Sequence, residues 1–430
     1  MESYFLDWAN LLLRWLHVIT AIAWVGSSFY FVFLDSSLTP PVDEALKKQG
    51  VSGELWAVHG GGFYHPVKFA GAPPQLPSHL HWFYWESYTT WLSGFALLTV
   101  SYLWNANIYL VNPANPLMSS GMAIAAALAF LVVFWLLYNG ICRVFGEKEG
   151  GDGIVGALVL VLVCMASYLA CQLFPGQAAF LLIGAMLATS MSANVFFWII
   201  PGQKKVIAAI QAGAPVDPVH GKRGKQRSVH NTYFTLPVLF AMLSNHYGWL
   251  HAHSMNWLVL ILMMFTGAAI RQFFVMRHGY KLGRNPHPWK YAAVGVAVLM
   301  GVMVWLQPPA PAPIGGNAAR IAPIGQSVLQ GESPAAPAQA PADSVAVAPM
   351  GSYAQLHSLM QQHCVVCHSS STIAQKNVKF DSAQDVQQHA QAIYQQVVLL
   401  RKMPFGNPGA LSDSEREAFK RWFEAGAVVP

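Results

Sequence analysis

Cys364-Val365-Val366-Cys367-His368 is the stretch that decides how the C-terminal part of this chain folds. Two cysteines separated by two residues and followed at once by a histidine are typical of c-type haem attachment, in which both thiols bond to the porphyrin and the histidine ligates iron. The alternatives are a redox-active cysteine pair or half of a zinc site. A zinc site needs a second ligand pair, and residues 351–430 contain no other cysteine. The pattern therefore predicts a covalent haem c held by Cys364, Cys367 and His368.

A second axial ligand is expected downstream, because a methionine sulfur raises the haem potential into the range of an electron acceptor. Met403 is the only methionine after His368. Pro404 and Gly406 follow it, and these residue types break helices and favour a rigid loop. Ordinary packing is the alternative role for Met403.

The segment around these ligands is predicted to be a small helical domain. Ser412 and Glu415 have the spacing of a helix-capping box, and three aromatic residues follow with the spacing of one helix face. A domain of this size has little core of its own, and a covalent haem would add apolar mass to it.

The rest of the chain has the composition of a membrane protein, since 54% of all residues are hydrophobic and 10% are charged. Apolar runs long enough to cross a bilayer as helices predict eight spans. The first lacks the basic start and clean cleavage site of a signal peptide, so we interpret it as a span. The eight spans cover residues 11–34, 84–104, 118–140, 154–173, 178–200, 229–247, 256–275 and 290–306.

These observations predict an all-α fold in three parts. Residues 1–306 form an eight-helix transmembrane bundle, residues 307–350 a Pro/Ala-rich linker, and residues 351–430 a small c-type cytochrome domain. The linker composition is typical of an extended tether that need not pack. The remaining cysteines lie in or beside the spans, where a buried structural thiol is the expected role.

Lysine and arginine residues predict the orientation of the bundle. The connections at 201–228 and 276–289 are rich in them, whereas those at 105–117, 174–177 and 248–255 hold no charged residue. The basic connections are therefore expected in the cytoplasm and both chain ends outside it. This predicts a multi-pass protein of the bacterial inner membrane with a periplasmic C-terminal domain, where c-type haem is attached. The net charge of +6 then reflects topology and indicates no nucleic-acid partner.

Polar side chains in the spans fall into two layers, and ionisable groups at membrane depth usually face an interior site. The outer layer contains His17 and His246, with His251 and His253 just beyond. A hydrogen-bonded core or interface histidine is an equally good interpretation of any one of these histidines. The inner layer comprises His81, Glu86, Asn194, His230, Asn231 and Arg271, together with His59, His65, Lys68 and His79 of the first connection.

The first connection, residues 35–83, is long, and long connections are more often functional than idle. Its His59-Gly60-Gly61-Gly62-Phe63-Tyr64 segment joins flexible backbone to aromatic side chains. An aromatic belt at the membrane interface explains Trp82 and Trp85 near the second span. It leaves Glu86 unexplained.

The chain resembles the membrane-bound, cytochrome-c-fused urate oxidases of bacterial purine catabolism. The resemblance covers nearly the whole chain; each membrane motif is weak alone, and their combination with the haem motif is more specific. It rests on Arg14-Trp15-Leu16-His17 with Ala23-Trp24-Val25-Gly26, the His59–Tyr64 segment, Leu80-His81-Trp82-Phe83-Tyr84-Trp85-Glu86, Ser192–Val195 with Pro201–Gln203, His230–Tyr233 with Ser244–Tyr247, and Cys364–His368 with Met403-Pro404.

The resemblance implies oxidation of urate to 5-hydroxyisourate, with electrons passed to haem c and on to a periplasmic cytochrome or a terminal oxidase, not directly to dioxygen. Such chemistry needs a base for a purine N–H, donors for the urate anion and stacking aromatic rings. The inner layer supplies candidates: Glu86 or His81 as proton acceptor, Lys68 and Arg271 as anion partners, Asn194 and Asn231 as amide contacts, and Trp82 or Tyr84 as stacking wall.

The first span is also similar to those of small haem-b membrane proteins, which makes His17 a candidate haem ligand. Because the hydrocarbon core is about 30 Å thick, electrons from an inner site need an intermediate carrier. We hypothesise a haem b in the bundle, ligated by His17 and His246. The alternative is two interface histidines and a substrate site near the outer face.

Two other classes of protein fit the same layers. One is a non-enzymatic electron-transfer subunit that passes electrons from a quinol or a partner to its cytochrome c. The other is a transporter with a cytochrome attached. Reduction of the haem by urate separates the enzyme from both.

Overall fold

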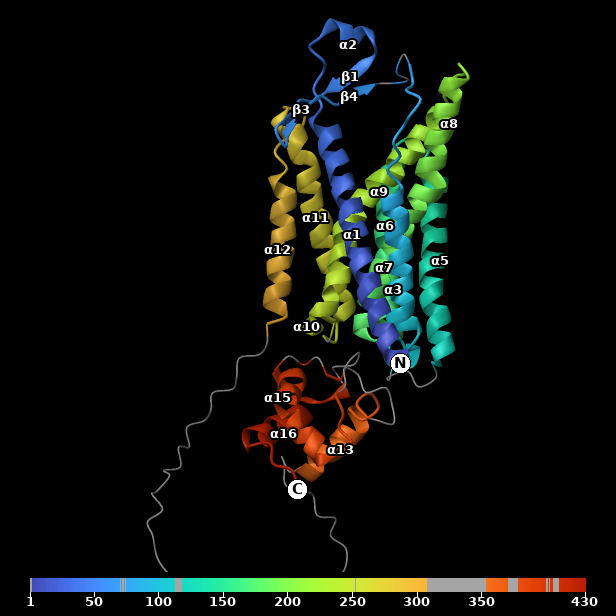
Figure 1. The fold of residues 1–430 in the computed structure, drawn as a ribbon. Helices are drawn as coiled ribbons and strands as arrows, with labels where there is room; N and C mark the ends of the chain where they lie inside the picture. Colours follow the sequence, from blue (N-terminus) through green and yellow to red (C-terminus); the bar gives the residue numbers. More distant parts are fainter. Residues whose placement is uncertain are drawn as a thin grey trace, which may run out of the picture.

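The computed structural model describes residues 2–69, 71, 73, 75–112, 118–251, 253–307, 353–369, 378–399, 401, 403, 404 and 410–430. These residues form a bundle of long helices and a small helical domain (Figure 1). The predicted linker lies outside the described residues except for Gln307.

Each predicted span coincides with a helix of the bundle. The short helices α4 (Ala106–Tyr109) and α10 (Gly248–His251) lie in connections. The bundle helices are α1 (Glu2–Ser37), α3 (Trp85–Leu98) with the π-helical turn η1 (Thr99–Leu103), α5 (Ser120–Phe145), α6 (Gly151–Leu173), α7 (Gly176–Asn194) with the π-helical turn η2 (Val195–Ile199) and α8 (Ile200–Gln211), α9 (Pro218–Leu243) with η3 (Ser244–His246), α11 (Asn256–Lys281) and α12 (Trp289–Trp305).

Among the described residues, five helical segments are long and apolar enough to cross a membrane. Helix α12 is apolar but shorter. Helix α3 is short because its regular part ends at η1 after 14 residues, and the first half of α9 is polar and basic. The count of eight spans therefore stays a prediction. The five segments are Tyr4–Ser37, Ser120–Phe145, Gly151–Leu173, Gly176–Gln211 and Asn256–Lys281.

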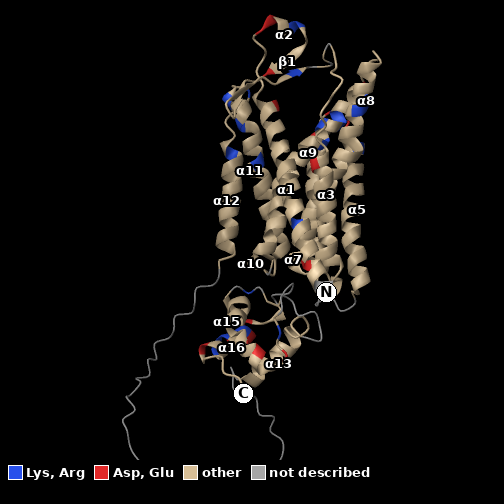
Figure 2. Ribbon diagram, in the orientation of Figure 1, with Lys and Arg blue, Asp and Glu red and all other residues tan. Residues whose placement is uncertain are grey.

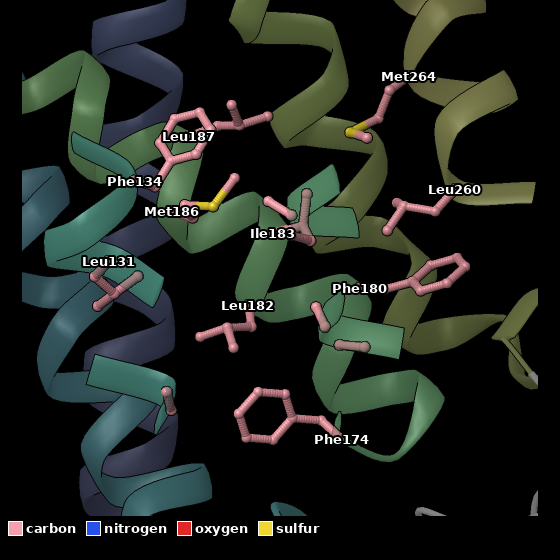
Figure 3. Packing of buried hydrophobic residues seen from close by; sticks show 14 of the residues in the cluster. Leu131, Phe134, Phe174, Phe180, Leu182, Ile183, Met186, Leu187, Leu260 and Met264 are labelled. Atoms are coloured by element: carbon pink, nitrogen blue, oxygen red, sulfur yellow. The ribbon is translucent and has the colours of Figure 1, made fainter. Parts of the chain in front are cut away.

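Helix α7 forms the centre of the bundle, because apolar side chains on all its faces are buried. Figure 3 shows Phe180, Ile183 and Met186 of this helix between side chains of α5 and α11. Close approach to α9 depends on Gly184, where an added Cβ would lie 2.8 Å from Ala241 Cβ. The outer surfaces of the surrounding helices carry exposed apolar side chains, as expected for helices that face lipid.

The two ends of the bundle differ in charge. The N-terminus and the end of α12 lie at one end, and α8 lies at the other together with the first connection (Figure 1). Basic side chains gather at the α8 end (Figure 2). This distribution agrees with the predicted asymmetry of the connections, and the assignment of the α8 end to the cytoplasm stays a prediction.

The first connection contains strands that the all-α prediction lacks. After α2 (Glu44–Lys48), β1 (Val51–Glu54) pairs antiparallel with β4 (Val67–Phe69). Between them β2 (Ala57–His59) and β3 (Gly62–Tyr64) form a hairpin. Its turn residues, Gly60 and Gly61, have φ of +57° and +79°, and glycine adopts these angles without steric cost.

The predicted basic connection 201–228 is mostly helical, which corrects its bounds. Helix α8 continues to Gln211 and α9 begins at Pro218, capped by the side chain of Asp217. The basic residues after Pro218 therefore lie on a helix that packs against the bundle.

The C-terminal domain has its own core. Its elements are α13 (Tyr353–His363), α14 (Ala383–Gln388), α15 (Ala390–Ile393), the π-helical turn η5 (Tyr394–Leu399) and α16 (Asp413–Glu424). The predicted capping box is confirmed, since Ser412 and Glu415 cap α16 reciprocally. Phe419 and Trp422 of α16 belong to the same buried cluster as Leu356 of α13, and the two helices are in contact.

Candidate functional site

Four inner-layer residues lie at a common level of the bundle, because a series of contacts joins their helices. Ser87 Oγ of α3 lies 3.1 Å from Ser192 Oγ of α7, which places Glu86 and Asn194 near the same level. Asn194 Nδ2 donates to Asn231 Oδ1 of α9 at 2.9 Å. The Tyr233 hydroxyl of α9 donates to Gln272 of α11, beside Arg271.

The two predicted amide contacts thus form one buried pair. Asn194 is fully buried and Asn231 is buried. Asn194 Nδ2 also donates to the Tyr138 hydroxyl at 2.9 Å, and that hydroxyl lies 2.8 Å from His230 Nδ1. Asn194 Oδ1 has no hydrogen-bond partner among the described residues. The pair therefore offers an unused carbonyl acceptor in the bundle interior.

Arg271 is a buried cation with few partners. Its side chain is 5% exposed, and its guanidinium carbon lies 3.8 Å from the centre of the Phe29 ring. Nε and Nη2 are buried and have no hydrogen-bond partner within the described part of the chain. A buried guanidinium with unpaired donors carries a desolvation cost that a bound anion would offset.

The other predicted members of the site lie where α3 begins. Glu86 is half-buried in the first turn of α3. Tyr84 precedes the helix, with its ring 5.2 Å from Tyr88. His81 is exposed and packs edge-on against Phe83 at 4.7 Å, and Trp82 is half-buried. No described contact decides between Glu86 and His81, or between Trp82 and Tyr84, so these roles stay predictions.

Lys68 lies on β4, at the surface. Its ammonium forms an ion pair with Asp35 at 2.8 Å, with both side chains more than half exposed. Because this ion pair already occupies its charge, Lys68 would have to exchange partners to hold a substrate anion. Its role stays a prediction.

The first connection also holds a carboxylate–histidine pair, Glu54 and His65, that the sequence analysis did not predict. His65 Nε2 donates to Glu54 Oε2 at 2.6 Å, and the indole of Trp56 stacks on the His65 ring at 4.0 Å. The main-chain N–H of Val42 and the His65 ring together hold the pKa of Glu54 below its usual value. Strand pairing of β1 with β4 creates this contact, so neither stretch alone reveals it.

Of the two predicted haem b ligands, His17 is held by hydrogen bonds within the bundle and His246 is exposed. His17 Nδ1 donates to the Thr90 carbonyl at 3.0 Å and lies 3.2 Å from Ser93 Oγ. A donor role for Nδ1 leaves Nε2 as the ring acceptor. His246 lies in η3 and is exposed. The described residues show no contact between His17 and His246, and their joint ligation stays a prediction.

The structure describes Cys364, His368 and Met403 of the predicted haem c site, and their role as haem ligands stays a prediction. Cys364 is buried, and burial raises the pKa of its thiol to about 12, so it is a neutral thiol at physiological pH. His368 Nδ1 donates to the Val378 carbonyl at 3.0 Å, so Nε2 is the ring nitrogen that carries no proton. Met403 is partly buried against the core that contains Cys364.

Arg416 fixes the backbone near Met403. This buried guanidinium of α16 donates to the Met403 carbonyl at 3.1 Å and to the Val397 carbonyl. The Met403 N–H in turn donates to the Gln396 carbonyl at 3.1 Å. Met403 is therefore positioned by its own main chain, whichever role its sulfur has.

A sequence profile described as Urate oxidase N-terminal matches residues 3–307. The chain belongs to this family. No curated protein and no solved structure matches the chain. The matched range contains every predicted bundle residue from His17 to Arg271, whereas Cys364 to Met403 lie beyond it. Membership of the urate oxidase N-terminal family supports an oxidoreductase that acts on urate.

Sequence reasoning missed Tyr138 and Arg227 of the urate oxidase N-terminal region. Tyr138 is fully buried and bonds both Asn194 and His230. Arg227 is 2% exposed and lies over the Tyr138 ring at 4.9 Å. The spacing of Arg227 and His230, one helical turn apart, was the available signal that both belong to one face of α9.

Proposed function

We propose that the chain oxidises urate to 5-hydroxyisourate and passes the electrons to a haem c held by Cys364, Cys367 and His368. In this reaction urate and water give 5-hydroxyisourate, two protons and two electrons. The observation that carries the proposal is Arg271, a buried cation with unpaired donors in a urate oxidase N-terminal region. Urate is an anion at neutral pH, and its oxygens are suitable acceptors for those donors.

The chain's own groups account for binding and proton removal. Arg271 holds the anion, and Asn194 Oδ1, an acceptor without a partner, receives a purine N–H. Asn231 and Tyr138 keep the Asn194 amide in one orientation, because both accept from Asn194 Nδ2. Glu86 or His81 accepts one of the two protons released on oxidation, and the other leaves to water. Burial of the amide pair limits the access of water to these contacts.

The C-terminal residues fit the proposed cofactor. The unprotonated Nε2 of His368 would ligate iron, Cys364 and Cys367 would anchor the porphyrin, and Met403 would supply the second axial ligand. These residues would hold a haem c that takes up the two electrons of urate one at a time, passing each on before it receives the next. In the bundle, His17 keeps Nε2 available for the hypothesised haem b. A pyridine haemochrome assay that finds only haem c would remove the haem b hypothesis.

The test is anaerobic mixing of the oxidised protein with urate, while the band of reduced haem is followed. We expect the band to rise without dioxygen and without stoichiometric hydrogen peroxide. Glu86→Gln should slow this rise and leave the haem spectrum unchanged, because it removes a proton acceptor and no iron ligand. A band that stays flat with urate but rises with a quinol would identify an electron-transfer subunit instead.

A further inference from the structure

A pocket outside the proposed urate site opens at the α8 end of the bundle. It lies between the end of α5, the turn η2 and the first half of α9. Four of its lining residues are basic, Arg143, Lys222, Arg223 and Arg227, and Glu147 is its acidic lining residue. A second pocket adjoins it and shares Trp198 and Arg223 with it. The combined hollow is therefore strongly cationic.

Arg227 forms the base of this pocket. Its guanidinium lies over the rings of Tyr138 and Trp198, at 4.9 and 5.3 Å. Nη2 donates to Asn139 Oδ1 at 2.9 Å. Nη1 is buried and has no hydrogen-bond partner among the described residues. A side chain that is 2% exposed thus brings an unused charged donor to the pocket.

The rim residues hold one another in place around the opening. Arg223 pairs with Glu147 at 2.6 Å, and Lys222 Nζ donates to the Glu147 main-chain carbonyl at 2.8 Å. Glu147 thus offsets part of the charge and leaves the basic residues in excess. The Lys222 ammonium keeps further N–H donors, since an ammonium has three.

The surroundings favour a ligand that reaches the pocket from the membrane boundary. Phe196 and Phe197 of η2 are about half exposed and directly precede Trp198. Basic pockets between helices near a membrane surface are suited to phosphate-bearing lipid headgroups. Arginine and lysine together can contact several oxygens of one phosphate, which distinguishes such a group from a carboxylate.

We propose that this pocket binds a phosphate group, with Arg227 Nη1 as its buried donor and Lys222 and Arg223 as rim contacts. An anionic phospholipid headgroup and free inorganic phosphate share this chemistry. The site includes neither Arg271 nor the Asn194–Asn231 pair, and it meets the proposed urate site only at Tyr138, whose ring lies under Arg227. Phosphate binding therefore stands whether or not the chain oxidises urate.

The test uses the full-length protein in a detergent without phosphate groups, titrated by calorimetry. The probes are short-chain phosphatidylglycerol, the matching diacylglycerol and inorganic phosphate. Arg227→Gln should weaken binding of the phosphate-bearing probe roughly thirtyfold or more, because a buried charged donor is lost. Lys222→Gln, on the exposed rim, should weaken it about fivefold. Lys204→Gln removes one charge from exposed α8 outside both pockets and should leave binding unchanged.

Each outcome decides the proposal. Binding of phosphatidylglycerol alone assigns the site to a lipid headgroup, and equal binding of inorganic phosphate assigns it to the free ion. Equal binding of the diacylglycerol would show that acyl chains alone are recognised and would overturn the proposal. Failure of both phosphate probes, or full affinity in Lys222→Gln and Arg227→Gln, would also overturn it. If Arg227→Gln does not fold, Lys222→Gln decides.

Discussion

Replacing Arg271 by methionine should make the protein more stable and less active. In the wild type, the guanidinium lies on Phe29 with Nε and Nη2 buried and unpaired. Folding therefore removes a charge from water without full compensation. Methionine keeps an unbranched side chain of similar length against Phe29 and carries no donor.

The size of both effects follows from this geometry. A buried donor without a partner costs about 1–3 kcal/mol, so Arg271→Met should raise the free energy of unfolding by an amount of that order. The same donors would bind the urate anion. Loss of a buried charged contact costs about 2–5 kcal/mol, which corresponds to a fall in kcat/KM of roughly thirtyfold or more.

Two assays on the same preparation measure these effects: thermal unfolding in detergent, with and without urate, and anaerobic reduction of haem by urate. Urate should raise the melting temperature of the wild type and not that of Arg271→Met, because only a ligand of the native state stabilises it. Arg277→Met is the matched control. It removes the same charge from the same helix at a half-exposed position, and we expect wild-type turnover.

A lower melting temperature in Arg271→Met with undiminished turnover would refute the reasoning, since Arg271 would then serve only the fold. An equal loss of turnover in Arg277→Met would also refute it, because the effect would then follow from net charge and not from the buried donors.

Three further predictions concern other parts of the chain. Changing Cys364 and Cys367 together to alanine should leave no covalent haem on a denaturing gel, and retained haem would exclude the motif. Reporter fusions after residue 306 and within 210–220 should report opposite compartments; the same compartment for both would overturn the eight-span count. The pKa of Glu54 is depressed in the folded chain, so its stabilising effect is present above the ordinary value of 4.5 and lost as the pH falls through the folded value. As the pH is lowered, the melting temperature of Glu54→Gln should therefore fall less than that of the wild type. An equal fall in both proteins would contradict this.

Apolar run length was sufficient to locate the bundle helices, because helices in lipid must satisfy their backbone polar groups internally and so form long continuous segments. The capping box of Ser412 and Glu415 was equally local, and it was confirmed. The strands of the first connection were missed because they are three or four residues long. The glycines at 60–62 were the available hairpin signal.

The sequence indicated which residues of the bundle are candidates for the site, but it did not indicate which side chains they contact. Arg271, Asn194 and Asn231 were identified because polar groups are costly at membrane depth. That Asn194 bonds Asn231, and that Arg271 lies on Phe29, depends on how α7 packs against α9 and α1 against α11. Arg227 was assigned to a connection because the basic residues around it resemble a cytoplasmic loop, whereas they belong to the first half of helix α9, which buries Arg227.

The π-helical turn η2 holds one residue more than an α-helical turn would, and it lies between the buried amides and the cationic pocket. Asn194 ends the regular part of α7, and Trp198 lies within the turn. Deleting one residue from Val195–Ile199 would convert the wide turn to an ordinary α-helical one. Five π-helical residues and four α-helical residues turn the chain through nearly the same angle, so α8 would keep its direction and its faces. The deletion would therefore rearrange only the side chains of the turn itself, among them Trp198, while Asn194 and α8 would keep their places. A one-residue insertion or deletion in η2 is thus a change that the helix absorbs locally, so the lining of the cationic pocket can vary while the buried amides stay in place.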